Sequence, residues 1–139
     1  MGAHNHLAPF VARLSEAGIR VSTFIEPDER AIEASARLRA PVVELHTGAW
    51  CEAVFADDKA ADEHGFERLA KGAWIARAAG LEVHAGHGLD YDTARRLAAV
   101  PEFVEFNIGH FLMGEALFSG LASVIREMRR AMDEGRGLA

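Results

Sequence analysis

The sequence has little of what defines secreted, membrane or nucleic-acid-binding proteins. It holds one cysteine, Cys51, so no intrachain disulfide can form and we expect a reducing, cytoplasmic setting. It has no run of about 18 apolar residues, and no basic segment precedes an apolar stretch at its start, so we expect no membrane span and no signal peptide. The net charge is −6, from 15 basic and 21 acidic residues, which disfavours a general binder of nucleic acid or of anionic membranes.

Several motifs of catalysis and nucleotide binding are absent as well. The sequence contains no G-x-S-x-G nucleophile turn, no Walker phosphate loop and no H-E-x-x-H zinc motif. The first predicted strand is not followed by G-x-G-x-x-G, which disfavours a dinucleotide-binding sheet.

What is present is a regular alternation of strand and helix patterns. The 139 residues suffice for one domain, 1–139. β-branched and aromatic residues bounded by turn residues predict strands over Arg20–Ile25, Val42–His46, Glu82–Ala85 and Phe103–Asn107. Helical periodicity predicts helices over Leu7–Ala17, Asp28–Leu38, His64–Ala79, Asp90–Ala99 and a last apolar stripe from Leu117 to Met132 that stops at Gly135.

This order predicts an α/β fold with a parallel sheet and right-handed crossovers. Four βα units preceded by one helix are half of a TIM (β/α)8-type barrel, which needs roughly 250 residues when complete. The second unit carries extra residues between Thr47 and Gly65. Because this insertion follows a strand, we expect it at the catalytic face, where it could act as a lid.

The most informative residues stand where strands end. Glu44 lies inside an apolar strand, where burial would raise the pKa of its carboxyl group, and it is either a catalytic carboxylate or a structural one paired with a base. His87 stands between two glycines, which favours a tight turn that presents one imidazole for acid–base chemistry. Gly109 and His110 open a helix after the last strand, where free N–H groups favour phosphate.

Four histidines lie near strand ends and allow a competing hypothesis. Imidazoles on a barrel rim can bind zinc or iron, so a metal-dependent barrel hydrolase is an alternative. Their spacing matches no metal-site motif, and phosphate is favoured over metal. These histidines are His46, His84, His87 and His110.

Four segments together resemble the pyridoxine 5′-phosphate synthase family. They are Val21–Glu26 (VSTFIE), Glu44–Gly48 (ELHTG), Ala85–Leu89 (AGHGL) and Asn107–His110 (NIGH). The resemblance implies a TIM barrel that condenses 1-deoxy-D-xylulose 5-phosphate with 3-amino-2-oxopropyl phosphate, releasing inorganic phosphate, in vitamin B6 biosynthesis. It implies no metal and no organic cofactor.

The resemblance also implies roles for individual residues. His87 would be the proton donor, and Glu44 the carboxylate that stabilises the transition state. Gly88, Gly109 and His110 would bind 3-amino-2-oxopropyl phosphate, the last two at its phosphate group.

The matching region corresponds to the C-terminal half of the family's barrel. The N-terminal half would supply a further catalytic histidine and glutamate and the residues that hold deoxyxylulose phosphate. The edge strands of a half-barrel would expose unpaired backbone N–H and C=O groups that can pair with another chain. We therefore expect a homo-oligomer or pairing with a separate N-terminal half. A second hypothesis is a truncated or engineered non-catalytic half-barrel that self-associates, which the start Met1-Gly2-Ala3 ahead of a mid-family sequence motivates.

Overall fold

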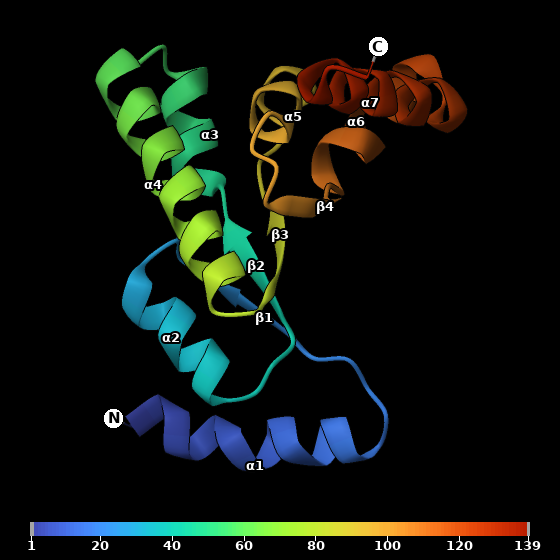
Figure 1. Cartoon of the computed structure of the whole chain (residues 1–139). Helices are drawn as coiled ribbons and strands as arrows, with labels where there is room; N and C mark the ends of the chain where they lie inside the picture. The colour runs from blue at the N-terminus through green and yellow to red at the C-terminus, as the bar shows by residue number, and fades with distance from the viewer. Residues whose placement is uncertain (1, 139) are drawn as a thin grey trace.

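The computed structural model describes residues 2–138, so Met1 and Ala139 of the predicted domain lie outside the described residues. Four strands form one parallel sheet in the order β1-β2-β3-β4 (Figure 1). The chain order is α1 (Gly2–Glu16), β1 (Ser22–Ile25), α2 (Glu29–Arg37), β2 (Val42–His46), α3 (Gly48–Phe55), α4 (Lys59–Ala78), β3 (Glu82–Gly86), α5 (Tyr91–Ala98), β4 (Phe103–Asn107), α6 (His110–Ser119) and α7 (Leu121–Arg136). This architecture is part of a TIM barrel, as the sequence predicted.

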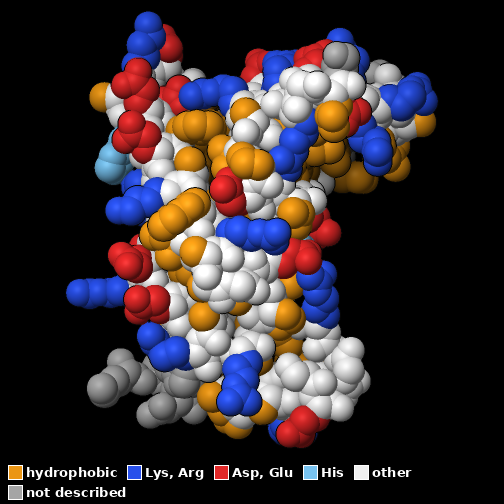
Figure 2. Space-filling model, in the orientation of Figure 1, with side chains coloured by type: hydrophobic (Ala, Val, Ile, Leu, Met, Phe, Trp, Pro, Cys, Tyr) orange, Lys and Arg blue, Asp and Glu red, His pale blue; other side chains and the backbone are white. Residues whose placement is uncertain are grey.

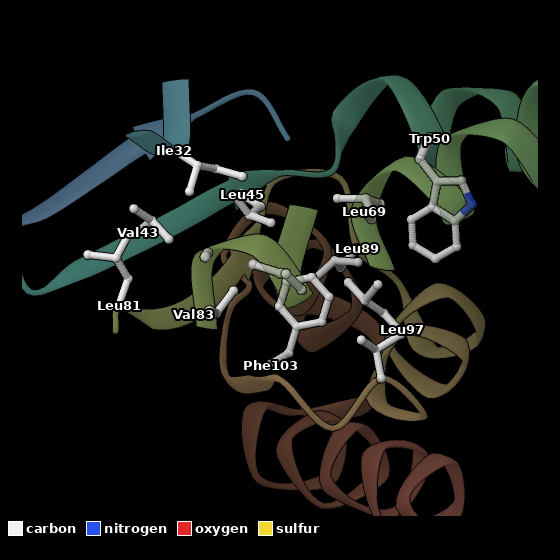
Figure 3. Close-up of a cluster of buried hydrophobic side chains, with 14 of the residues drawn as sticks. Ile32, Val43, Leu45, Trp50, Leu69, Leu81, Val83, Leu89, Leu97 and Phe103 are labelled. Atoms are coloured by element: carbon white, nitrogen blue, oxygen red, sulfur yellow. The ribbon is translucent and has the colours of Figure 1, made fainter. Parts of the chain in front are cut away.

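The hydrophobic core lies between one face of the sheet and the helices. Alternate strand residues such as Val43, Leu45 and Val83 point into it and are fully or almost fully buried (Figure 3). Phe103 of β4 and Leu69 of α4 close the same cluster. Burying each such side chain contributes roughly 1.5–3 kcal/mol, so this face fixes the register of the sheet.

Aspartate side chains cap two of the helices that the sequence predicted. The Asp28 side chain accepts from the backbone N–H of Ala31 at the start of α2. Asp90 and Thr93 form a reciprocal capping box at the start of α5. Each cap satisfies N–H groups that have no partner within the helix and contributes about 1 kcal/mol.

The structure shows secondary structure that the sequence did not predict in the insertion between Thr47 and Gly65. This segment is largely helical, because it forms α3 and the first turns of α4, which begins at Lys59 rather than at His64. Trp50 and Cys51 of the segment are buried in the core and are part of the scaffold, whereas Phe55 at the end of α3 is exposed. A lid role for the exposed part of the segment stays a prediction.

The predicted last helix is also different, because it is two helices. Gly120, with a φ of 80°, separates α6 from α7, and a left-handed Gly137 rather than Gly135 ends α7. Gly135 lies inside α7, where a side-chain methyl group would overlap the backbone carbonyl of Arg95. The glycine is needed for the close packing of α7 on α5, and both helices are visible at the upper right of Figure 1.

Within residues 2–138, no helix is both long and apolar enough to cross a bilayer.

Candidate active site

The carboxyl ends of the strands border one cavity of about 860 Å³. All five site residues predicted from the sequence line it, although they come from β2, from the turn after β3 and from the start of α6. These residues are Glu44, His87, Gly88, Gly109 and His110. Parallel strands place their carboxyl ends at one edge of the sheet, which is why residues so far apart in sequence meet there.

Glu44 extends from β2 toward β4. Its Oε2 accepts a hydrogen bond from Asn107 Nδ2 at 3.0 Å. The carboxylate lies across Gly86 of β3, where a side-chain methyl group would overlap Glu44 Oε1. Partial burial raises the pKa of the Glu44 carboxyl group above its ordinary value, and the nearby carboxylate of Glu105 raises it further, against the lowering effects of His84 and Asn107.

His87 stands in a backbone conformation that favours glycine. Its φ is 83°, and Gly88 follows with a φ of 82°. A residue with a side chain seldom adopts this conformation, and it persists where neighbouring groups hold it. The buried Thr47 does so here, since its hydroxyl lies 2.8 Å from the carbonyl oxygen of Gly86 and 2.5 Å from that of His87 and shares its one proton between these two acceptors.

The start of α6 is the part of the cavity suited to an anion. The N-cap residue is Gly109, which has no side chain to cap the helix, and Gly109, His110 and Phe111 line the cavity. His110, the first residue of α6, adds an imidazole at the same place. Among the described residues that line the cavity there is no lysine or arginine. Backbone N–H groups, the imidazoles of His87 and His110 and the side-chain amide of Asn107 are therefore the hydrogen-bond donors that this lining offers.

The other two rim histidines lie outside the cavity lining. His84 is buried between the carboxylates of Glu82, at 2.8 Å, and Glu105, at 3.3 Å. His46 packs against the His87 ring, with ring centroids 4.8 Å apart, and its Nδ1 lies 2.7 Å from Glu26 Oε1. The described part of the chain contains no group of three or more metal-ligating side chains placed to hold an ion.

Cys51 lies next to the same turn but is not a nucleophile. Burial raises the pKa of its thiol to about 11, so the thiol stays protonated at neutral pH. Its Sγ lies 3.8 Å from the carbonyl oxygen of His87, and a methyl group at Gly88 would come within 3.1 Å of its Cβ. Cys51 therefore supports the turn by packing.

Sequence reasoning assigned no role to several residues that form the site. Asn107 and Thr47 stood within quoted motifs, and each is a polar residue directly at a strand end, which is a signal that could have identified them. Three aromatic side chains that line the cavity carry no such signal, because their position depends on the tertiary fold. They are Phe24, Phe55 and Phe111.

The fold and the cavity are those of part of a TIM barrel, with the cavity at the carboxyl ends of the strands. The sequence model of the family described as pyridoxal phosphate biosynthesis protein PdxJ matches residues 1–134. The chain belongs to this family.

Curated relatives named pyridoxine 5′-phosphate synthase agree with this assignment. The chain is 57% identical over 139 residues to the one from Bradyrhizobium diazoefficiens, covering 100% of the chain and 56% of the relative. It is 60% identical over 139 residues to that of Bradyrhizobium sp. ORS 278, covering 100% of the chain and 54% of the relative. For Ruegeria pomeroyi the identity is 54% over 132 residues, covering 95% of the chain and 53% of the relative. The chain spans about half the length of the curated relatives it matches.

The environment of Glu44 leads to a prediction about its titration. An NMR titration of the side-chain carboxyl carbon should give a midpoint above the ordinary value of 4.5. Asn107→Leu should raise the midpoint further because the amide donor is lost, and Glu105→Gln should lower it because a neighbouring negative charge is lost. The pKa of Glu44 is higher in the folded than in the unfolded chain, so protonated Glu44 favours folding. Its contribution to the free energy of unfolding is fully present below about pH 4.5 and is lost as pH rises through the folded pKa.

A midpoint at or below the ordinary value, or one that neither substitution moves, would contradict this account of the Glu44 carboxylate.

Proposed function

We propose that the chain is the C-terminal half of a pyridoxine 5′-phosphate synthase. In this reaction 1-deoxy-D-xylulose 5-phosphate condenses with 3-amino-2-oxopropyl phosphate to give pyridoxine 5′-phosphate, inorganic phosphate and water. The observation that carries the proposal is the gathering of five motif residues from separate segments around one cavity. Membership of the family and the names of the curated relatives support the same reaction. A cytoplasmic location, which the single cysteine favours, is part of the proposal.

His87 and Glu44 have the chemistry that their proposed roles need. His87 is exposed on a fixed turn, so its imidazole can give a proton to a leaving oxygen of a substrate in the cavity. Glu44 is partly withdrawn from water, and a carboxylate in such a place interacts strongly with positive charge that develops in a transition state. Neither role needs a metal ion or an organic cofactor.

Gly88, Gly109 and His110 are proposed to bind 3-amino-2-oxopropyl phosphate. The open N-terminus of α6 would take the phosphate group, with His110 as a second donor. The absence of lysine and arginine from the described lining means that the remaining neutralising charge would come from outside this chain. The proposal therefore predicts an incomplete site, and the chain alone should show little or no synthase activity.

Two open surfaces support pairing with a separate N-terminal half. β1 and β4 are the edges of the sheet within the described residues, and both carry half-exposed apolar side chains, Phe24 and Val104. Further exposed apolar side chains lie on α6 and α7, at the upper right of Figure 1, and orange side chains are visible on the lower side of that region in Figure 2. They include Met113, Leu117, Phe118, Leu121 and Ile125.

The charge of the other sheet face argues against closure by a second copy. On the face opposite the core, Glu44 of β2 and Glu105 of β4 are both aligned with His84 of β3, and Glu82 lies two residues before His84 on the same face. Arg20 is paired with Glu82 at 2.6 Å. The hydrogen bond from Arg20 lowers the pKa of Glu82 to about 2, so this carboxylate is charged. Two copies facing each other would bring two acidic faces into one barrel interior, which is unfavourable. A half that presents basic side chains fits better.

The phosphate site is tested by binding of inorganic phosphate to the chain, measured by calorimetry at low ionic strength. His110→Ala should weaken binding by about three- to tenfold, the loss of one hydrogen bond to an anion. His64→Ala, an equivalent change at an exposed position on α4, is the control and should leave binding unchanged. Equal affinity of the wild type and His110→Ala, or no binding to the wild type, would contradict the proposed site.

Assembly is tested by light scattering coupled to gel filtration at micromolar concentration. Alone, the 15.1 kDa chain should elute as self-associated species because its apolar edges are uncovered. Addition of the N-terminal half of the Bradyrhizobium diazoefficiens relative should replace these by a complex of one chain with one half. A well-folded monomer that ignores the added half would show that the edges need no partner.

A further inference from the structure

We propose that Glu26 and His46 are positioning residues that fix the imidazole of His87. The three side chains come from the ends of three consecutive strands, since Glu26 directly follows β1, His46 ends β2 and His87 directly follows β3. This inference rests on the proposed function only in naming His87 as the proton donor.

The first contact joins Glu26 to His46. Glu26 Oε1 lies 2.7 Å from His46 Nδ1, and the second carboxylate oxygen lies 3.9 Å from an Nη atom of Arg68. A carboxylate accepts hydrogen bonds, so His46 donates its proton from Nδ1 to Glu26. In the neutral ring this leaves Nε2 without a proton, which is the tautomer a free imidazole in water seldom favours.

The second contact joins His46 to His87. The ring centroids are 4.8 Å apart with an angle of 63° between the planes, and the Phe24 ring packs on His46 in a T-shaped arrangement with centroids 5.1 Å apart. His46 lines a separate small cavity with Glu26, whereas His87 lines the large one. His46 therefore acts on the large cavity through His87.

Gly48 packs closely against both imidazole rings. A methyl group on Gly48 would come within 2.7 Å of His46 Nε2 and 2.9 Å of His87 Cδ2, so both rings lie against the same Cα atom. His87 is thus bounded by His46 and by Gly48, while Thr47 holds its backbone. A proton donor works best when its ring is held in one orientation, and this arrangement supplies that restraint.

The arrangement is tested by NMR on the chain labelled with ¹⁵N at histidine, which requires no activity. Two-bond nitrogen–proton correlations at neutral pH identify the protonated nitrogen of each ring. We expect His46 in the wild type to carry its proton on Nδ1. Glu26→Ala should convert His46 to the Nε2-protonated form and shift the ring signals of His87, since its neighbour is released. Glu26→Gln should retain both sets of signals because the amide oxygen accepts the same proton.

Glu33→Ala is the matched control, since this glutamate pairs with Arg37 on the exposed face of α2. It should leave both histidines unchanged. An Nε2-protonated His46 in the wild type, or His87 signals that do not respond to Glu26→Ala, would overturn the inference. If Glu26→Ala fails to fold, the wild-type tautomer and the Glu26→Gln spectrum still decide. Failure of phosphate binding would contradict the proposed function but would leave this result unaffected.

Discussion

The hydroxyl group of Thr47 is the contact on which the site depends. It joins the end of β2 to the turn after β3, because its one proton is shared between the carbonyl oxygens of Gly86 and His87. The backbone N–H of Thr47 also donates to Gly86 at 3.0 Å, which extends the pairing of β2 with β3 by one residue. A left-handed conformation at a residue with a side chain costs on the order of 1–3 kcal/mol, and these buried hydrogen bonds offset it. The position of the His87 imidazole follows from them.

A second constraint is that the sheet is open. The helix-covered face has an apolar core, with residues such as Val43 and Phe103 fully buried within the chain itself. The opposite face and both edges are uncovered and carry acidic and apolar side chains. The cavity lies at the carboxyl ends of the strands, and its described lining holds Glu44, His87 and His110 but no lysine or arginine.

The sequence predicted much of this arrangement because its signals are local. Strand positions followed from β-branched runs, and Gly86-His87-Gly88 indicated a tight turn because glycine tolerates a left-handed backbone. The expected carboxylate Glu44 lies inside β2 as predicted, with a raised pKa. Family membership was confirmed, whereas the roles of His87, Glu44, Gly88, Gly109 and His110 stay predictions.

What could not be predicted depends on contacts between distant segments. The pairing of Asn107 with Glu44 requires the register of three strands. The burial of Trp50 within the insertion that follows β2 requires the packing of α3 on α4. The contact of Glu26 with His46 joins two strand ends that are separated by 20 residues. No periodicity within one segment reports such contacts.

The account is tested most directly by the crystal structure of the Thr47→Val variant, with Thr47→Ser as the control. Valine keeps the shape of threonine but removes the hydroxyl donor. The His87 carbonyl then loses this hydrogen bond at a cost of about 1–3 kcal/mol, whereas the Gly86 carbonyl keeps the backbone N–H of residue 47. The account predicts that His87 leaves the left-handed conformation in Thr47→Val and that its imidazole turns away from Gly109 and His110, while Thr47→Ser keeps both in place. An unchanged His87 turn in Thr47→Val would contradict it.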